Sequence, residues 1–299
     1  MQITTIGDKT YQVLMDGGPE HLAIERNVKA MAVELKELDA IVLSHWHSDH
    51  SGGILKALEL RQSSSSSLSS SSKSLSPLDT LDPLNSLPVD LHPERPIRRG
   101  IAPPPKRIPI AVLPADPTFE QIESAGGRVQ LSDEPHDVIG RDGCSTGVRV
   151  SGEIPRVEPF ERGLVGAVTS YVVRSALASA RLRSPLITSP HSCSHAGICN
   201  VLTDAQTTYD RPIHMVVGGF HLVPTAQQPV TETVDFLSRR LRPTPKYVLP
   251  LHCTGLEARA MIRQAMGDAC IPAGVGMRVT VEAKADDEID ADDELQILG

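Results

Sequence analysis

The fold of this chain is decided by the stretch Leu43-Ser-His45-Trp46-His47-Ser48-Asp49-His50-Ser51-Gly52-Gly53. Three imidazoles and one carboxylate fall within six residues, directly after a short apolar run and before a pair of glycines that opens a helix. Alternate residues at a strand end face the same side, so His45 and His47 can point together while Asp49 and His50 turn toward a second position. Neutral imidazole and carboxylate ligands suit Zn²⁺, Fe²⁺ or Mn²⁺. We therefore predict a metal site here, in preference to a loop of solvated histidines.

The segments on both sides of this stretch alternate between strand and helix patterns. Before it, the apolar run Tyr11–Met15 ends at the turn-forming Asp16–Pro19, and an amphipathic helical stripe follows. The stripe consists of Ile24, Val28, Met31 and Leu35. After it, Ile54–Leu60 predicts a helix, and residues 221–281 repeat the same alternation. Shorter strands are expected at Ile108–Leu113, Arg128–Leu131, Gly147–Val150 and Pro185–Thr188, with a helix at Thr118–Ser124. Such alternation predicts an α/β fold of layered sheets and helices.

Two segments break this pattern. Ser63–Ser76 has eleven serines in fourteen positions, and prolines recur as far as Pro105. Such a composition cannot bury enough apolar surface to offset its ordering entropy. We expect one domain over residues 1–281 that is interrupted by a disordered insertion at about 61–106. The tail at 282–299 has eight carboxylates against one lysine and is also expected to be disordered.

Composition narrows the class of protein. The chain of 299 residues is 40% hydrophobic and 22% charged, which is close to the values of globular proteins. Aromatic residues are only 3%, and most of the net charge of -8 lies in the acidic tail, so we expect no nucleic-acid partner. No apolar run is long enough to span a membrane, and residues 1–10 lack the pattern of a signal peptide. Five cysteines without CxxC spacing favour a reducing, cytoplasmic location.

Four later stretches add to the information in the histidine run. They are Ser151-Gly-Glu-Ile-Pro-Arg-Val157, Cys193-Ser-His-Ala-Gly-Ile-Cys-Asn200, Gly218-Gly-Phe-His-Leu222 and His252-Cys-Thr-Gly255. With them, the chain resembles the metallo-β-lactamase superfamily. More narrowly, it resembles the 7,8-dihydropterin-6-yl-methyl-4-(β-D-ribofuranosyl)aminobenzene-5′-phosphate synthase-like branch, because the four stretches occur in that branch's order. The resemblance implies a four-layer αββα sandwich, with two sheets face to face, helices outside and a metal pocket at one rim.

The resemblance also implies the ligands of one or two divalent metals, with Zn²⁺ expected first and Fe²⁺ or Mn²⁺ as alternatives. The first metal would be held by His45, His47 and His195, and the second by Asp49, His50 and His252. Asp16 matches an early aspartate of the superfamily that supports the ligands, and Asp49 would orient the attacking water. Cys193 and Cys253 adjoin two of the ligands, and for these cysteines buried packing is favoured over ligation.

Three further residues have less specific patterns. In the superfamily a carboxylate bridges the two metals at about the place of His221, and an imidazole does not bridge as a carboxylate does. We therefore expect His221 to ligate the second metal or to contact substrate, with a hydrogen bond to a loop carbonyl as the alternative. Glu153 and Arg156 could bind an anionic substrate or form a salt bridge at a sheet edge.

Together these patterns predict a metal-dependent, hydrolase-type enzyme. In it, a metal-activated water would attack an ester, a lactone or a phosphoester-like small molecule, and the branch implies a pterin-related substrate. The alternative is a metal-binding protein with little or no catalysis, such as a sensor or a decayed enzyme. The expected partner is a small-molecule substrate, without nucleic acid or membrane, and the sequence does not define an oligomeric state.

Overall fold

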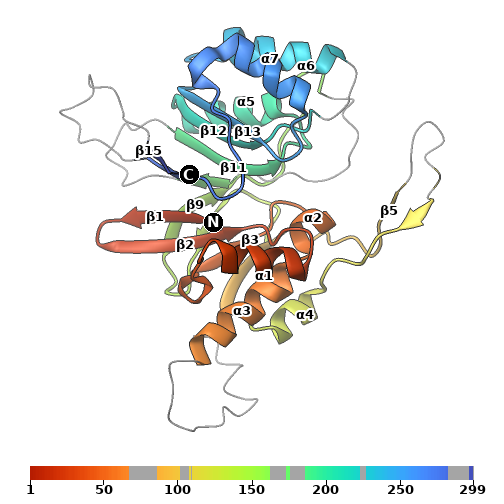
Figure 1. Cartoon of the computed structure of the whole chain (residues 1–299), viewed down its shortest axis with the longest axis vertical. Coiled ribbons are helices and arrows are strands. Elements are labelled where there is room, and N and C mark those ends of the chain that lie inside the picture. The colour runs from red at the N-terminus through yellow and green to blue at the C-terminus, as the bar shows by residue number, and fades with distance from the viewer. Residues whose placement is uncertain are drawn as a thin grey trace. The chain divides into compact units, whose positions relative to one another are not determined.

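The computed structural model describes residues 1–66, 86–101, 108, 110–161, 173–175, 186–222, 227–281 and 296–298 (Figure 1). The chain separates into two compact units. Unit 1 comprises Met1–Ile3, Tyr11–Asp133 and Val138–Thr146, and unit 2 comprises Thr4–Thr10, Glu134–Asp137 and Gly147–Gly299. Each unit is built around one main β-sheet.

The first sheet lies almost entirely in unit 1 and has five strands in the order β1-β2-β3-β4-β7. The strands are β1 (Gln2–Ile6), β2 (Lys9–Met15), β3 (Ala40–Val42), β4 (Leu87–Leu91) and β7 (Gly127–Leu131). The last four run parallel, with Val13 paired to Ala40, and Val89 paired to Ile41 on one side and to Val129 on the other. Every residue of β3 and β4 is buried, as expected for interior strands of a parallel sheet.

Helices cover this sheet and complete the core of unit 1. They are α1 (His21–Ala30), the short α2 (Ser48–Ser51), α3 (Ile54–Ser66) and α4 (Phe119–Ser124). In Figure 1, α1 and α3 lie side by side, and the core beneath them includes the buried side chains of Ile41, Leu58 and Leu87. The helix predicted at Thr118–Ser124 is confirmed as α4. It begins with a capping box, in which the side chains of Thr118 and Gln121 accept hydrogen bonds from each other's backbone N–H.

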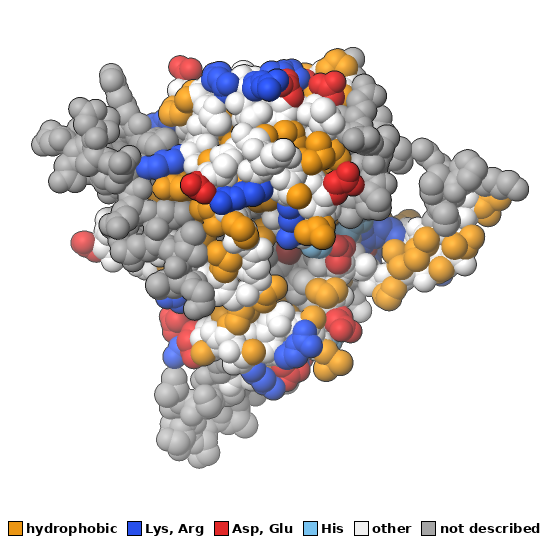
Figure 2. Space-filling model, turned by 45° about the horizontal axis from the view of Figure 1, so that its top comes forward, with side chains coloured by type: hydrophobic (Ala, Val, Ile, Leu, Met, Phe, Trp, Pro, Cys, Tyr) orange, Lys and Arg blue, Asp and Glu red, His pale blue; other side chains and the backbone are white. Residues whose placement is uncertain are grey.

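A small hairpin of β5 (Gly100–Ile101) and β6 (Ala111–Val112) also belongs to unit 1. Large apolar side chains are exposed around it, and Figure 2 shows hydrophobic atoms gathered there. They belong to Ile97, Ile101, Ile108, Ile110 and Val112. Within the strand predicted at Ile108–Leu113, the described residues Ala111 and Val112 form β6.

The second sheet belongs mainly to unit 2 and has six strands in the order β13-β12-β11-β10-β9-β8. The strands are β8 (His136–Ile139), β9 (Ser145–Val150), β10 (Val173–Ser175), β11 (Leu186–Cys193), β12 (Ile213–Gly219) and β13 (Tyr247–Leu251). Strands β11, β12 and β13 are parallel, whereas β10 pairs antiparallel with both β9 and β11. Because β11, β12 and β13 are parallel neighbours, their carboxyl ends lie at the same edge of the sheet.

Helices α5 (Ile198–Tyr209), α6 (Gln227–Asp235) and α7 (Leu256–Met266) accompany this second sheet (Figure 1). Helix α6 continues into a π-helical turn at Phe236–Arg240. Their apolar faces form a core that includes the fully buried side chains of Leu202, Phe220 and Ile262. Within the described ranges, no helix has the length and apolar character needed to cross a membrane.

Two expectations of disorder are wrong in part. Leu87–Leu91 falls inside the insertion expected at 61–106, yet it forms the buried strand β4, and α3 extends to Ser66. Gln296–Leu298 falls in the tail expected to be disordered, yet it forms β15 against β14 (Arg278–Thr280). In both places a short apolar pattern is hidden by the polar composition around it. Residues 67–85, 102–107 and 282–295 lie outside the described residues.

The helical stripe is also shorter than its sequence pattern. The stripe extends to Leu35, but α1 ends at Ala30, and Leu35 lies in a separate 3-10 turn at Leu35–Glu37. The backbone N–H of Val33 bonds the carbonyl of Val28, which closes the helix end. Leu35 is nevertheless buried in the core of unit 1, so its apolar side chain serves packing as the stripe implies.

Candidate metal centre

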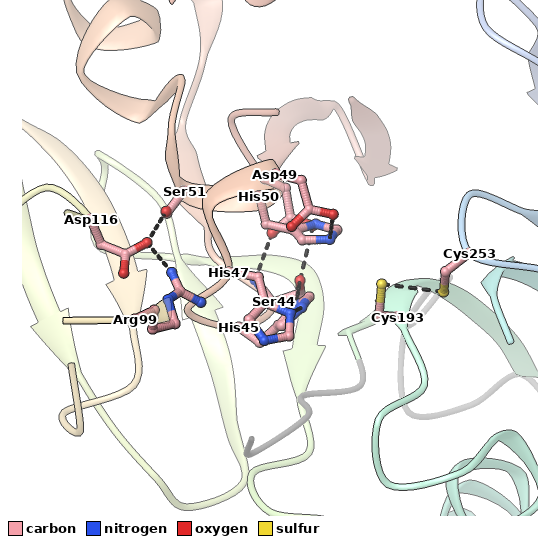
Figure 3. A network of polar contacts seen from close by, with 11 residues as sticks. Ser44, His45, His47, Asp49, His50, Ser51, Arg99, Asp116, Cys193 and Cys253 are labelled. Atoms are coloured by element: carbon pink, nitrogen blue, oxygen red, sulfur yellow. Dashed lines mark hydrogen bonds and ion pairs between the residues drawn. The ribbon is translucent and has the colours of Figure 1, made fainter. Parts of the chain in front are cut away.

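The histidine run leaves β3 and enters the short helix α2 (Figure 3). The N–H of His47 bonds the carbonyl of His45, and the N–H of His50 bonds the carbonyl of His47, so the run turns tightly. As a result, Nε2 of His45 lies 3.0 Å from Nδ1 of His47, and the ring centroids of His45 and His50 are 4.2 Å apart. The rings of His45 and His50 are buried. Three imidazoles thus converge within unit 1, and their nitrogens form a donor set that suits a divalent metal.

Asp16 joins two parts of this run. It follows β2, and its side chain accepts hydrogen bonds from the backbone N–H of Ser44 at 2.7 Å, from the Ser44 hydroxyl at 2.9 Å and from Nδ1 of His50 at 2.9 Å. The Ser44 hydroxyl also lies 2.9 Å from Nδ1 of His45. A hydrogen bond at one ring nitrogen fixes the tautomer and directs the other nitrogen toward a ligand. These are the contacts that a residue supporting metal ligands needs.

Carboxylates contact His50 at both ring nitrogens. Asp16 bonds Nδ1, and Oδ2 of Asp49 lies 3.2 Å from Nε2. Burial of the ring lowers the pKa of His50, but the hydrogen bonds to Asp16 and Asp49 outweigh burial and raise the pKa to about 9. The surroundings of this ring therefore favour positive charge, as the surroundings of a cation site should. The Asp49 side chain is 48% exposed, so solvent reaches it.

A second group of contacts fixes the loop around the histidine run. The indole Nε1 of Trp46 donates to the carbonyl of His92 at 2.9 Å. The buried carboxylate of Asp116 accepts hydrogen bonds from the Ser51 hydroxyl and the Arg99 guanidinium (Figure 3). Sequence reasoning missed Asp116 and Arg99, because each stands alone in a proline-rich stretch without a motif. Their contacts connect the segment that follows β4 to helix α2.

The three candidate histidines of unit 2 follow its three parallel strands. His195 comes after β11, His221 after β12 and His252 after β13. His195 is buried, and its ring centroid lies 4.2 Å from that of His221. His221 and His252 have left-handed backbone, with φ of +52° and +46°, which costs a non-glycine residue about 1–2 kcal/mol. Unit 2 therefore carries its candidate ligands at one edge of its sheet.

Two cysteines lie at the same edge. Cys193 ends β11, Cys253 follows His252, and the two sulfurs are hydrogen bonded at 3.3 Å (Figure 3). The hydrogen bond with Cys193 lowers the pKa of Cys253 most strongly. Burial opposes this effect, but the neighbouring rings of His221 and His252 assist it, and the pKa falls to about 4. Packing, the interpretation favoured from the sequence, does not by itself account for a contact between two sulfurs and an imidazole.

The turn that carries His195 is positioned by hydrogen bonds to Glu161, which lies outside the quoted stretches, and to Asn200. The buried carboxylate of Glu161 accepts hydrogen bonds from the N–H groups of Cys199 at 3.0 Å and Asn200 at 2.9 Å, in the first turn of α5. The side-chain oxygen of Asn200 in turn accepts hydrogen bonds from the N–H groups of Val157 at 2.8 Å and of the residue after it at 2.7 Å. A carboxylate at a helix start satisfies N–H groups that the helix leaves unpaired. Sequence reasoning missed Glu161, because a single glutamate gives no signal.

The predicted residues thus fall into two groups. Unit 1 brings together Asp16, His45, His47, Asp49 and His50. Unit 2 carries His195, His221 and His252 at its sheet edge. Glu153 and Arg156 lie in the segment after β9, where Glu153 is exposed and Arg156 is half-buried.

Comparisons with known proteins find one family profile and two curated relatives. The sequence profile of the Metallo-beta-lactamase superfamily matches residues 7–63, which contain the histidine run. The chain is 25% identical over 265 residues to a 7,8-dihydropterin-6-methyl-4-(beta-D-ribofuranosyl)-aminobenzene-5'-phosphate synthase of Methanocaldococcus jannaschii, with 85% of this chain and 79% of that protein covered. An uncharacterized protein of the same organism is 24% identical over 258 residues, with 85% and 83% covered.

A solved structure supports the fold independently. It is described as a metal-dependent hydrolase of the β-lactamase superfamily, and it aligns with a TM-score of 0.59 and 19% identity over 88% of this chain and 86% of that one. At this level of identity the match informs on the fold alone. The α/β fold expected from the sequence is therefore confirmed.

Proposed function

We propose that this chain is a metal-dependent enzyme of the hydrolytic type, because its residues 7–63 match the metallo-β-lactamase superfamily. The observation that supports the proposal best is the cluster of three imidazoles and two carboxylates around His45 and His50 in unit 1. Burying such groups costs free energy unless they are paired with one another or with a metal. Metal binding explains a cluster of this composition better than packing does.

Two sets of residues are proposed to hold the metals, following the resemblance. The first set is His45, His47 and His195, and the second is Asp49, His50 and His252. The nitrogen and oxygen donors of these sets suit Zn²⁺ first, with Fe²⁺ and Mn²⁺ as alternatives. When bound, a metal of this kind lowers the pKa of water and polarises the oxygen of the group under attack.

The chain's own residues have separable tasks in this proposal. Asp16 holds Nδ1 of His50 and so keeps Nε2 directed toward its ligand position. Asp49 is half-exposed, and it orients the attacking water; if only one metal is bound, it also takes up a proton at a carboxylate oxygen. Glu161 caps α5 and fixes the turn from which His195 extends.

The substrate is proposed to be a small ester, lactone or phosphoester. The curated relative is named as a synthase of a phosphorylated ribofuranosyl-aminobenzene joined to a dihydropterin, and this name favours a pterin-related aromatic phosphate as one special case. Arg156 is half-buried in the segment after β9, and its guanidinium is suited to bind a phosphate by two parallel hydrogen bonds. Glu153, exposed in the same segment, would contact polar groups of the substrate. Because a fold does not define a substrate, several classes need to be screened.

The test is elemental analysis of the purified full-length protein, followed by a screen with phosphoesters, lactones and thioesters. We expect bound metal and turnover of at least one class. The double variant His45→Ala/His47→Ala should lose turnover and part of the bound metal, whereas His21→Ala, which changes an exposed histidine of α1, should keep both in full. Protein that is metal-free and stays inactive after addition of Zn²⁺, Mn²⁺ or Fe²⁺ would contradict the proposal. Protein that binds metal without any turnover would support the alternative, a metal-binding protein with little or no catalysis.

A further inference from the structure

A second donor cluster lies entirely within unit 2. Strand register brings it together: Cys193 on β11 pairs with Gly219 on β12, and Gly219 pairs with Leu251 on β13. His221 follows Gly219 by two residues, and Cys253 follows Leu251 by two residues. Because the three strands are parallel, their carboxyl ends lie at one level of the sheet. Backbone pairing, rather than a flexible loop, therefore defines the positions from which these three side chains extend.

The distances within the cluster suit a metal ion. One ligand atom from each of Cys193, His221 and Cys253 lies within 4.8 Å of the other two, and the two sulfurs are 3.3 Å apart. Two sulfurs that bind one Zn²⁺ at about 2.3 Å in tetrahedral geometry are about 3.8 Å apart. Small side-chain rotations would open the sulfur pair to that separation.

The surroundings of His221 also favour a bound metal ion in this cluster. Its Nδ1 is buried, and no described atom forms a hydrogen bond with it. A buried polar atom without a partner costs about 1–3 kcal/mol, a cost that a bound ion would remove. The left-handed backbone at this residue, with φ of +52°, is a strained conformation of the kind that gathers at binding sites. The hydrogen bond to a loop carbonyl that the sequence left open for His221 is not formed at this nitrogen.

We propose that Cys193, His221 and Cys253 form a thiolate-rich metal site that is selective for thiophilic ions such as Zn²⁺ and Cd²⁺. Thiolates are softer ligands than imidazoles and carboxylates, so this site has a different metal preference from the histidine run. Cys193 is buried, whereas Cys253 and His221 are half-buried. Ions can therefore reach the cluster from the side of Cys253 and His221. The inference goes beyond the proposed function, which gives neither cysteine a role, and it does not depend on hydrolysis.

The test is a titration of reduced full-length protein with Cd²⁺, followed by ultraviolet absorption of the thiolate-to-cadmium charge transfer. Wild-type protein should show a saturable band. Cys193→Ser and Cys253→Ser should each lose about half of the band or more, since each removes one of two sulfur ligands. Cys144→Ser, which changes an exposed cysteine of unit 1, should keep it. The variant His45→Ala/His47→Ala should also keep the band, which separates failure of this inference from failure of the proposed function.

A measurement on wild-type protein removes any dependence on how the variants fold. Alkylation of Cys253, followed by mass spectrometry, should slow by about tenfold or more when Cd²⁺ is added, because a metal-bound thiolate is a poor nucleophile. Circular dichroism checks that the serine variants are folded. The inference is overturned if wild-type protein shows no thiolate band, if folded serine variants keep the full band, or if Cd²⁺ leaves the alkylation rate of Cys253 unchanged.

Discussion

Replacing Asp16 with asparagine tests how the histidine run is organised. Asparagine has nearly the same shape and tolerates the left-handed backbone of Asp16, whose φ is +58°, so backbone geometry is preserved. The amide oxygen can still accept the hydrogen bond from the Ser44 N–H that Oδ1 accepts at 2.7 Å. The amide nitrogen, however, replaces Oδ2, which accepts hydrogen bonds from the Ser44 hydroxyl and from Nδ1 of His50 at 2.9 Å each. Two donors thus lose their acceptor.

The expected magnitude follows from the contact with His50, the proposed metal ligand. A hydrogen bond to a charged group contributes about 1.5–3 kcal/mol. Loss of a residue that orients a metal ligand lowers metal affinity by about 10–100-fold, which corresponds to about 1.4–2.8 kcal/mol. The two ranges agree, so we expect Asp16→Asn to bind Zn²⁺ about 10–100-fold more weakly than wild-type protein.

The assay is competition for Zn²⁺ with a coloured chelator, with circular dichroism to confirm the fold. Asp39→Asn is a matched control. Asp39 belongs to unit 1, its side chain is 14% exposed, and it accepts a hydrogen bond from the N–H of Gln12 at 2.8 Å. This control should keep wild-type affinity. If folded Asp16→Asn also keeps wild-type affinity, Asp16 does not orient His50 and the reasoning is wrong.

Three further changes test other parts of the structure. Glu161→Ala should lower the melting temperature by several degrees, because two N–H groups of α5 lose a charged acceptor that contributes about 1.5–3 kcal/mol. The control Glu161→Gln should lower the melting temperature less. Equal melting temperatures for wild-type protein and Glu161→Ala would argue against the cap. Gly53→Ala should lower the free energy of unfolding in urea by about 1–3 kcal/mol, because the added Cβ overlaps a backbone carbonyl, whereas Gly274→Ala, which has open space around it, should be neutral. Replacement of residues 67–85 by a short Gly-Ser linker should leave the melting temperature nearly unchanged, since loop closure depends weakly on length. A deletion that also removes Leu87–Leu91 should prevent folding, because its buried apolar side chains contribute about 1.5–3 kcal/mol each, and a cooperative melting transition in that protein would contradict this.

The parts of the structure that could be predicted from the sequence depend on neighbours along the chain. The convergence of His45, His47 and His50 follows from spacing within one strand end and one helical turn. Helix α4 was predictable for the same reason, since Thr118 and Gln121 cap it from positions three residues apart. In both cases, the spacing of residues along one segment determines how their side chains meet.

The parts that could not be predicted depend on partners far apart in the sequence. Strand β4 is a five-residue pattern in a serine- and proline-rich stretch, and its burial comes from pairing with β3 and β7. The contact between Cys193 and Cys253 joins residues 60 positions apart. It follows from the register of three parallel strands, and register is a property of the paired sheet that spacing along one segment does not contain. The absence of a CxxC pattern therefore said nothing about whether two cysteines would meet in space.

Backbone strain gives an independent reason to connect the selected residues with function. Among the described residues, five other than glycine have left-handed backbone. Two of these have a structural explanation, because Ala32 lies just past the end of α1 and Asp210 terminates α5, where this conformation is common. The other three are Asp16, His221 and His252. Each follows a parallel strand rather than a helix, so helix termination does not explain them. Strained conformations of this kind persist where surrounding contacts hold them, and they gather at binding and catalytic sites. All three were selected from the sequence for their chemistry, without any reference to backbone angles. Strain at strand ends, a criterion independent of residue type, therefore falls on three of the positions that the sequence had already selected.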